Sequence, residues 1–257
     1  MTLPLDQIVC GDNREVMGSF PDDSIDLVVT SPPYDNLRTY GGHSWDFEGV
    51  AAQLWRVIKP GGVVVWVVND ATVDGSETGT SFRQALHFME LGFRLHDTMI
   101  YQTEKQPING NRYEPKFEFM FVFSAGKPNA WNPIRERSTY AGTKTGATYR
   151  QANGDLKQRH GRATIAEMKT RGNVWNIPSG NCQATIAGNH PASFPEALAR
   201  DHILSWSNEG DIVLDPFSGS GTTAKMAKLN GRRWIGLEIN KEYCEIAEHR
   251  LSQGVLF

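Results

Sequence analysis

Strand-like and helix-like segments alternate along most of this chain of 257 residues, and that alternation constrains its fold more than any other feature. Residues 63–68 are five valines and one tryptophan, a composition typical of a central strand that is buried on both faces. Strands that alternate with helices form parallel sheets whose two faces are covered by the helices. The sequence therefore predicts an α/β fold with a doubly wound, mostly parallel sheet.

The positions of the strands and helices follow from hydrophobic periodicity and from turn residues. Strands are expected at residues 7–10, 25–30, 62–68, 94–101, 117–123, 212–215 and 233–238. Helices are expected at residues 14–19, 47–58, 80–90, 195–206, 222–229 and 241–251. A polar loop joins the strands at 94–101 and 117–123, so these two are expected to pair antiparallel. Residues 127–178 have few apolar side chains and no clear period, which indicates an insert or a subdomain.

Charge is distributed unevenly along the chain. The whole chain has 26 Lys and Arg against 29 Asp and Glu, a formal net charge of −3. Residues 127–171 alone hold ten Lys and Arg against three acidic residues, a local charge of +7, which leaves −10 for the rest. A basic insert on an acidic body is the pattern expected of a protein that meets a phosphate backbone. A solvated loop with a chance excess of arginine is the alternative.

The cysteines and the apolar runs indicate the environment of the protein. Cys10, Cys182 and Cys244 are far apart and lack the spacing of a metal site, so we expect no bound metal and a reducing, cytoplasmic environment. The first ten residues have neither the basic stretch nor the apolar core of a signal peptide. No apolar run approaches the roughly 18 residues of a membrane span, so no membrane association is expected.

A proline-rich loop, Ser31, Pro32, Pro33 and Tyr34, follows the expected strand at 25–30. Pro32 has no N–H for a sheet ladder, and Pro33 biases Pro32 toward an extended conformation. The loop therefore stands at the carboxyl end of a strand, where open α/β sheets bind ligands. Its hydroxyl and carbonyl oxygens can accept hydrogen bonds from an amine, and Tyr34 can stack on a ring. This set suits a flat ring that carries an amino group.

A second loop, near the end of the chain, has the composition of a ligand-binding turn. It consists of Asp215, Pro216, Phe217, Ser218, Gly219, Ser220 and Gly221, and a helix is expected from Thr222. Its two glycines let the backbone approach a ligand where a Cβ would block it. Glu238, at the end of the next strand, can accept hydrogen bonds from both hydroxyls of a ribose. A dinucleotide fits less well, because Asp215 would repel a pyrophosphate and the loop lacks the Gly-x-Gly-x-x-Gly pattern.

Together, the two loops resemble the catalytic loop and the cofactor loop of the amino-methylating DNA methyltransferases. The catalytic loop comes first in the chain, an order that resembles the β group of that family. The resemblance implies a Rossmann-like, S-adenosylmethionine-dependent methyltransferase fold with an inserted target-recognition region. It also implies a catalytic half at 1–126, a basic target-recognition insert at 127–180 and a cofactor-binding half at 181–257.

S-adenosylmethionine is the cofactor that the resemblance implies. The cofactor-binding residues implied by it are Asp12, Phe194, Asp215, Pro216, Phe217, Ser218, Gly219, Gly221, Thr222, Glu238, Ile239 and Asn240. Phe217 and the glycines would wrap the methionine part, Glu238 would hold the ribose, and Ile239 would pack on the adenine. Asp12 matches the acidic position that receives the adenine amine; a helix N-cap is its other interpretation, and the two are compatible.

The implied reaction is methyl transfer to the exocyclic amine of a base that has been flipped out of duplex DNA. The catalytic residues would be Ser31, Pro32, Pro33 and Tyr34, with the Ser31 hydroxyl and the Pro32 carbonyl accepting hydrogen bonds from the amine. Family members with serine at the first loop position usually methylate cytosine N4, and those with Asp or Asn usually methylate adenine N6. We therefore expect a site-specific cytosine-N4 methyltransferase, with adenine N6 as the alternative. Asp70 could relay a proton, although a turn residue is the favoured interpretation.

Double-stranded DNA is the expected partner. The residues expected to contact it are Arg38, Arg135, Arg137, Lys144, Arg150, Arg159 and Arg162. Some of these would bind phosphates and others would read guanine edges, and the sequence does not separate the two roles. A methylase of RNA or of protein glutamine, and a catalytically silent DNA-binding regulator on the same fold, are alternative functions. A homodimer and a cognate restriction endonuclease are open as further partners in a restriction-modification system.

Overall fold

The computed structural model describes residues 2–33, 45–103, 113–146, 148–158, 161, 163–178 and 195–253. The chain divides into two compact units. The first, which we call the sheet unit, comprises Met1–Asn132 and Asn173–Phe257, and the second, the insert unit, comprises Pro133–Gly172. None of the helices in the described part of the chain has the length and apolar character that a membrane crossing requires.

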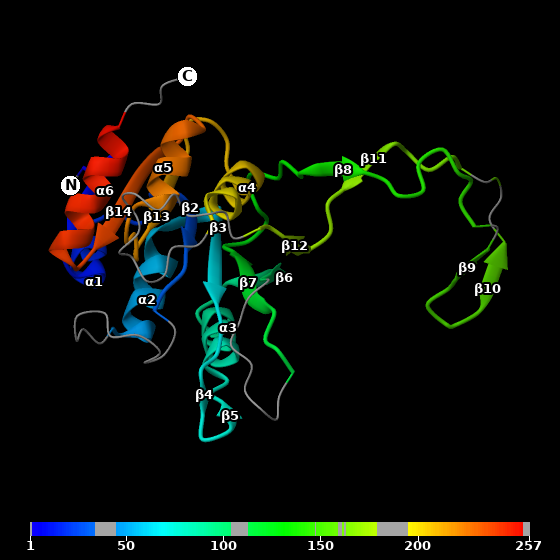
Figure 1. The fold of residues 1–257 in the computed structure, drawn as a ribbon, viewed down its shortest axis with the longest axis horizontal. Helices are drawn as coiled ribbons and strands as arrows, with labels where there is room; N and C mark the ends of the chain where they lie inside the picture. Colours follow the sequence, from blue (N-terminus) through cyan, green and yellow to red (C-terminus); the bar gives the residue numbers. More distant parts are fainter. Residues whose placement is uncertain are drawn as a thin grey trace. The chain divides into compact units, whose positions relative to one another are not determined.

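The sheet unit is built on one central sheet (Figure 1). In the described residues, this sheet has eight strands in the order β1 (Gln7–Cys10), β14 (Arg233–Glu238), β13 (Ile212–Asp215), β2 (Ile25–Thr30), β3 (Ile58–Val68), β7 (Phe117–Ser124), β6 (Arg94–Gln102) and β12 (Val174–Asn176). The first five strands are parallel, and β7 is antiparallel to both β3 and β6. The mostly parallel sheet and the antiparallel pair at β6 and β7 confirm the expectations from the sequence.

Six helices cover this sheet in the part of the chain that the structure describes: α1 (Asn13–Gly18), α2 (Phe47–Val57), α3 (Thr80–Glu90), α4 (Glu196–Trp206), α5 (Thr222–Leu229) and α6 (Lys241–Ser252). The crossovers through α1 and α2 lead along the sheet in one direction, and the crossover through α5 leads in the other. Because such crossovers are right-handed, α1 and α2 lie on one face and α5 on the opposite face. α3 packs beside α2, and α4 and α6 pack beside α5, so the sheet is doubly wound.

Side-chain caps begin several of these helices. The Asp12 carboxylate accepts hydrogen bonds from the N–H groups of Arg14 (2.9 Å) and Glu15 (3.2 Å) at the start of α1. The Asn240 side chain accepts from the N–H of Glu242 at the start of α6 (2.9 Å). Such caps satisfy amide groups that have no partner inside the helix. The N-cap interpretation of Asp12 is therefore confirmed.

The core lies around β3. Val63 to Val68 are each 2% exposed or less, as expected of a strand buried on both faces. Trp66 contacts Phe88 of α3, and its indole N–H donates to the buried Gln84 amide oxygen (2.9 Å). The indole nitrogen is thus satisfied inside the core, which a buried tryptophan requires.

β3 begins four residues earlier than expected. Ile58 pairs with Ile25, and the register of the two strands then shifts before Val63 pairs with Leu27. The intervening residues include Gly61, whose φ of +80° favours glycine and whose Cβ position is occupied by the Asn129 side chain. This irregularity hides the first part of the strand from a periodicity argument.

The insert unit contains two short hairpins, β8 (Arg135–Arg137) with β11 (Met168–Thr170), and β9 (Thr148–Arg150) with β10 (Leu156–Gln158). None of its described residues is buried, so the hairpins depend on backbone pairing and not on a core of their own. The unit lies inside the 127–180 range expected for the insert. The flanks differ from that expectation, because Trp175 of β12 is 5% exposed and β12 joins the central sheet beside β6. A strand of three residues is too short to give a periodic signal.

Candidate active site

The two sequence loops start from neighbouring strands. β2 and β13 pair in parallel, with Leu27 opposite Val213 and Val28 opposite Leu214. Both strands therefore end at the same edge of the sheet, with the proline-rich loop after Thr30 and the glycine-rich loop after Asp215. The Thr30 hydroxyl donates to the Asp215 carboxylate across this edge (2.6 Å). This bond joins residues 185 positions apart in the chain and places the starts of the two loops side by side at one edge of the sheet.

The glycine-rich loop is held by hydrogen bonds from three directions. The Phe217 N–H donates to Asp215 Oδ1 (3.0 Å), and the Gly219 N–H donates to Glu238 Oε2 (2.8 Å). The Asn13 side-chain amide donates to the Pro216 carbonyl oxygen (3.1 Å). The loop backbone therefore has a fixed path at the carboxyl ends of β13 and β14.

Glycine is required where this loop meets α5. Gly221 is the N-cap of α5 and has a φ of +79°, in the left-handed region that disfavours other residues. A Cβ at this position would lie 3.1 Å from the Cβ of Ala247 in α6. The absence of a Cβ at Gly221 therefore lets the end of the loop pack closely against α6.

Asp215 is a buried carboxylate. Asp215 is 1% exposed, and the loss of solvation on burial raises the pKa of its carboxyl group to about 6. The hydrogen bonds from Thr30 and from the Phe217 N–H act in the opposite direction and limit the rise. In the structure, the Asp215 carboxylate accepts hydrogen bonds from Thr30 and from the Phe217 N–H. Its direct contact with a cofactor stays a prediction.

Glu238 lies at the end of β14, beside the end of β1. Its Oε1 accepts from the Asn240 N–H (2.8 Å) while Oε2 accepts from Gly219, so the carboxylate is fixed in direction. The Gly11 N–H donates to the Glu238 carbonyl oxygen (2.9 Å), which brings the Asp12 segment to the same edge. Ile239 is 43% exposed and offers an apolar surface next to these two carboxylates.

These groups fit an adenosyl group in their chemistry. Carboxylates accept hydrogen bonds from ribose hydroxyls and from an adenine amine, and an exposed aliphatic side chain suits the face of a ring. Asp12, Glu238 and Ile239 would hold the group in this way. Ser218 and Thr222 are buried in the loop and at the first turn of α5, and their contact with a cofactor stays a prediction.

The catalytic loop is described only for its first three residues. Pro32 is buried, and Ser31 and Pro33 are partly exposed at the edge beside Asp215. Five of the residues predicted for the site or for DNA contact lie outside the described residues: Tyr34, Arg38, Arg159, Arg162 and Phe194.

An aromatic cluster stands beside the cofactor loop, and the sequence analysis missed it. Phe217 packs edge-to-face on Trp45, with ring centroids 4.9 Å apart, and also contacts Trp66. Trp45 in turn contacts Phe47 at the start of α2. The two aromatic residues separated by one position, Trp45 and Phe47, were the signal available in the sequence. Contact of Phe217 with the methionine part stays a prediction.

Asp70 serves the start of α3. Its Oδ1 accepts from the Ser81 N–H (2.8 Å) and its Oδ2 from the Ser81 hydroxyl (2.6 Å). The Thr78 hydroxyl also donates to Asp70 (3.3 Å). The carboxylate therefore caps the helix from the segment after β3, a structural role that gives no support to a proton relay.

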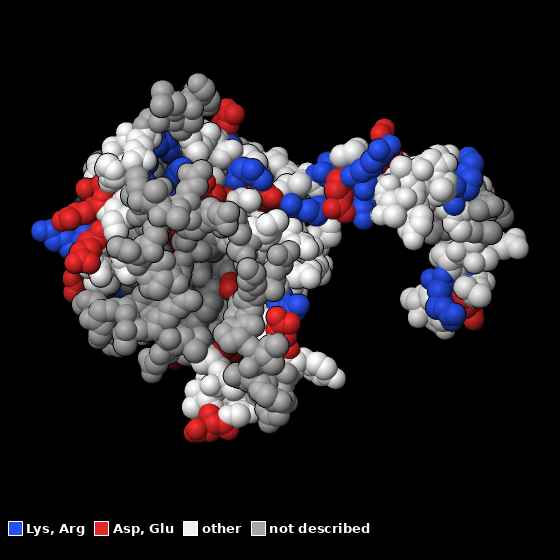
Figure 2. All heavy atoms as spheres, in the orientation of Figure 1, with Lys and Arg blue, Asp and Glu red and all other residues white. Residues whose placement is uncertain are grey.

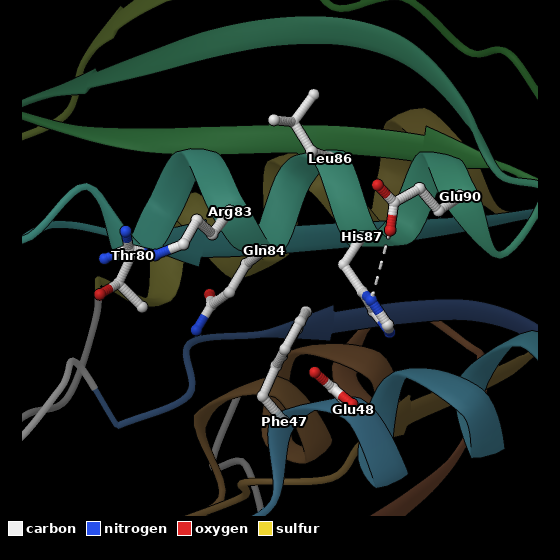
Figure 3. A pocket seen from close by; sticks show the side chains of 8 residues that line it. All are labelled: Phe47, Glu48, Thr80, Arg83, Gln84, Leu86, His87 and Glu90. Atoms are coloured by element: carbon white, nitrogen blue, oxygen red, sulfur yellow. Dashed lines mark ion pairs between the residues drawn. The ribbon is translucent and has the colours of Figure 1, made fainter.

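A pocket of about 410 Å³ opens between α2 and α3 (Figure 3). It is lined by Phe47, Glu48, Thr80, Arg83, Gln84, Leu86, His87 and Glu90. Figure 3 shows His87 directed toward Phe47 and Glu48, and Leu86 directed away from them. His87 Nδ1 lies 3.8 Å from Glu90 Oε2. None of the residues predicted for the active site lines this pocket.

The insert unit carries the other predicted DNA contacts (Figure 2). Arg135 and Arg137 lie on one face of the hairpin of β8 and β11, since alternate residues of a strand share a face. On the opposite face Lys169 pairs with Glu136 (3.0 Å). Lys144 donates to the Thr164 hydroxyl (3.0 Å), and Arg150 to the Gly154 carbonyl oxygen (2.8 Å). The unit holds nine Lys and Arg against three acidic residues in its sequence, a charge of +6.

Comparison with known proteins agrees with this geometry. A family model described as DNA methylase, for N6 and N4 methyltransferases, matches residues 25–249. The orphan methyltransferase M.BamHII of Bacillus amyloliquefaciens is 56% identical over 242 residues, which cover 91% of each protein. The DNA adenine methyltransferase YhdJ of Escherichia coli (strain K12) is 31% identical over 255 residues, which cover 95% of this chain and 82% of YhdJ.

A solved structure that contains the cofactor has a fold similar to that of this chain. TTHA0409 of Thermus thermophilus, in complex with S-adenosyl-L-methionine, aligns with a TM-score of 0.64 at 26% sequence identity. The alignment covers 96% of this chain and 95% of TTHA0409. The chain therefore belongs to the DNA methylase family of N6 and N4 methyltransferases, and it is an S-adenosylmethionine-dependent DNA methyltransferase.

Proposed function

We propose that this enzyme transfers a methyl group to N4 of a cytosine that has been flipped out of duplex DNA. The observation that carries the proposal is the position of Ser31, the first residue of the catalytic loop, beside the cofactor loop at one edge of the sheet. Family members with serine at this position usually methylate cytosine N4. Adenine N6 is the second candidate, because YhdJ, a relative at 31% identity, is named a DNA adenine methyltransferase.

The proposed chemistry depends on hydrogen bonds to the amine. When bound, S-adenosylmethionine supplies a methyl group on a sulfonium. An exocyclic amine is a poor nucleophile, because its lone pair is delocalised into the ring. The Ser31 hydroxyl and the Pro32 carbonyl would accept hydrogen bonds from the amine and return electron density to its nitrogen. Positioning of the amine in line with the methyl group would supply most of the remaining acceleration.

A strong general base is not needed before attack. The amine becomes cationic as it accepts the methyl group, and its proton is then acidic enough to leave without a strong base. This is consistent with Asp70 being engaged in capping α3. Tyr34, outside the described residues, is proposed to stack on the flipped base and to replace part of the stacking lost from the duplex.

The insert unit is proposed to recognise the target sequence. Its charge of +6 complements a phosphate backbone, and its described residues are all at least partly exposed. The guanidinium groups of Arg135 and Arg137 have the fork geometry that binds phosphates or guanine edges. The division into a catalytic half, this insert and a cofactor-binding half belongs to the same proposal.

The test is product identification. The enzyme is incubated with labelled S-adenosylmethionine and a mixture of unmethylated DNA, RNA and protein, and the digested nucleosides are analysed by mass spectrometry. N4-methylcytosine is expected. N6-methyladenine as the product would contradict the base assignment and retain the role of the loop. Labelled RNA or protein, with no methylated base in DNA, would contradict the proposed substrate.

A further inference from the structure

The backbone pairing of β2 and β13 stops short of the two active-site loops. The last paired residues are Val28 and Leu214. Beyond this pair, hydrogen bonds from side chains hold the ends of the strands. The Thr30 hydroxyl donates to Asp215 Oδ1 (2.6 Å), and the Thr223 hydroxyl at the start of α5 donates to the Val29 carbonyl oxygen (3.2 Å).

The bond between Thr30 and Asp215 is enclosed. Thr30 is 0% and Asp215 is 1% exposed. A hydroxyl that donates to a carboxylate at this depth cannot exchange its partner for bulk water without leaving a buried charge poorly solvated. The bond therefore holds its geometry more strictly than a surface hydrogen bond would.

Each partner of this bond is followed at once by one of the loops. Thr30 precedes Ser31 of the catalytic loop, and Asp215 precedes Pro216 of the cofactor loop. The oxygen that receives the Thr30 hydroxyl, Asp215 Oδ1, also receives the Phe217 N–H (3.0 Å). One carboxylate oxygen therefore fixes both the end of β2 and the path of the cofactor loop.

We propose that Thr30 and Asp215 are positioning residues that couple the two loops, so that cofactor bound at the glycine-rich loop orders the loop that receives the target base. The part that concerns the base rests on the proposed function of Ser31 and Pro32. The part that concerns the cofactor rests only on the family and on the geometry above. Neither residue needs to touch a reacting atom for this role.

The coupling has a pH signature. The pKa of Asp215 is raised to about 6, mainly by burial and to a smaller extent by the charge of Glu238, against the lowering by hydrogen bonds from Thr30, the Phe217 N–H and Thr223. A Thr30→Val substitution keeps the shape of the side chain but removes one of the groups that lower this pKa. The acid limb of the pH profile should therefore move to higher pH in that variant.

The experiment compares Thr30→Val with Thr30→Ser, which keeps the hydroxyl. Ser124→Ala is the matched control, because Ser124 is fully buried, donates to the Gly126 carbonyl oxygen (2.8 Å) and lies at the opposite end of the sheet. Hydrogen exchange is measured on each protein with and without S-adenosylhomocysteine. kcat is measured as a function of pH on unmethylated DNA.

In the wild type, S-adenosylhomocysteine should protect peptides from both 25–33 and 212–221; within 25–33 the Ser31 amide reports on the catalytic loop, because Pro32 and Pro33 have no N–H. In Thr30→Val, protection should persist at 212–221 and be lost at 25–33, and kcat should fall about 10- to 100-fold, the size expected for a small misplacement of reacting groups. Thr30→Ser and Ser124→Ala should resemble the wild type in protection and in pH profile.

Two results would overturn the coupling. One is Thr30→Val with wild-type protection of both segments and an unmoved pH profile. The other is an equal loss in Thr30→Ser, which would assign the effect to packing and not to the hydroxyl. Failure to methylate DNA would overturn the proposed function alone, because hydrogen exchange with S-adenosylhomocysteine tests the coupling without any substrate.

Discussion

At the scale of single residues, Asp215 carries a charge in the interior, and its protonation should affect stability. The pKa of Asp215 is about 6 in the folded protein, against 3.8 normally. Protonation of Asp215 therefore stabilises the folded protein; this contribution is fully present below pH 3.8 and is lost as the pH rises through 6. The shift corresponds to about 3 kcal/mol. Asp215→Asn removes this pH dependence. The free energy of unfolding of the variant, relative to that of the wild type, should therefore rise by about 1.4 kcal/mol between pH 5 and pH 8. Urea denaturation of both proteins at the two pH values measures it, and a difference that is the same at both would contradict the raised pKa.

Glu238 is the residue with the clearest expected effect on cofactor affinity. Its carboxylate accepts from Gly219 and Asn240 and is directed by them. Glu238→Gln keeps the size of the side chain but removes the charge, and the loss of a charged hydrogen bond should weaken S-adenosylhomocysteine binding by about 1.5–3 kcal/mol. Calorimetry measures the affinity. An affinity equal to that of the wild type would exclude Glu238 as the ribose ligand.

At the scale of elements, α3 depends on a cap from outside the helix. Asp70 satisfies the Ser81 N–H at the start of α3, where the N-cap residue itself is Gly79 and offers no side chain. Asp70→Ala should therefore lower the free energy of unfolding by about 0.5–2 kcal/mol. Under conditions where the variant is folded, kcat should match that of the wild type. A large loss of kcat in the folded variant would restore Asp70 as a proton relay.

The hairpin of β8 and β11 carries Arg135 and Arg137 on one face, where Arg137 also lies 3.8 Å from Glu167, and Lys169 paired with Glu136 on the other. The two faces allow a test within one element. Arg135→Glu with Arg137→Glu should weaken DNA binding and lower the slope of log affinity against log salt by about 2, since each phosphate contact contributes about 0.9. Lys169→Gln, on the face where Lys169 pairs with Glu136, is the matched control and should leave the slope nearly unchanged. Titration of DNA at several salt concentrations measures both. A change of the same size per unit of charge removed on the two faces would show that the unit acts only through its total charge.

At the scale of the whole molecule, the sequence predicted most of the strands of the sheet and the position of the proline-rich loop at the carboxyl end of a strand. β2 and β13 were expected at the bounds that the structure shows, because each is a short apolar run closed by a turn. The sequence did not predict β12 or the early start of β3, since three residues and an irregular register leave no period.

The side-chain contacts within the site could not be predicted from the sequence either. That Thr30 donates to Asp215 depends on β2 and β13 being neighbours, and hydrophobic periodicity carries no information on which strands pair. The packing of Trp45 on Phe217 also depends on tertiary structure. The residue types at the site were predictable from chemistry, whereas their partners follow from topology.

The claim that Ser31 acts on a cytosine amine beside the cofactor is tested most directly by single-turnover methylation of DNA, followed by mass spectrometry of the nucleosides. Wild type, Ser31→Ala and the control Ser124→Ala are compared, with S-adenosylhomocysteine affinity measured in parallel. We expect N4-methylcytosine from the wild type and from Ser124→Ala, and a rate about 10- to 100-fold lower from Ser31→Ala at unchanged affinity, because one of two acceptors for the amine is lost. N6-methyladenine as the only product, or a wild-type rate from Ser31→Ala, would contradict the account.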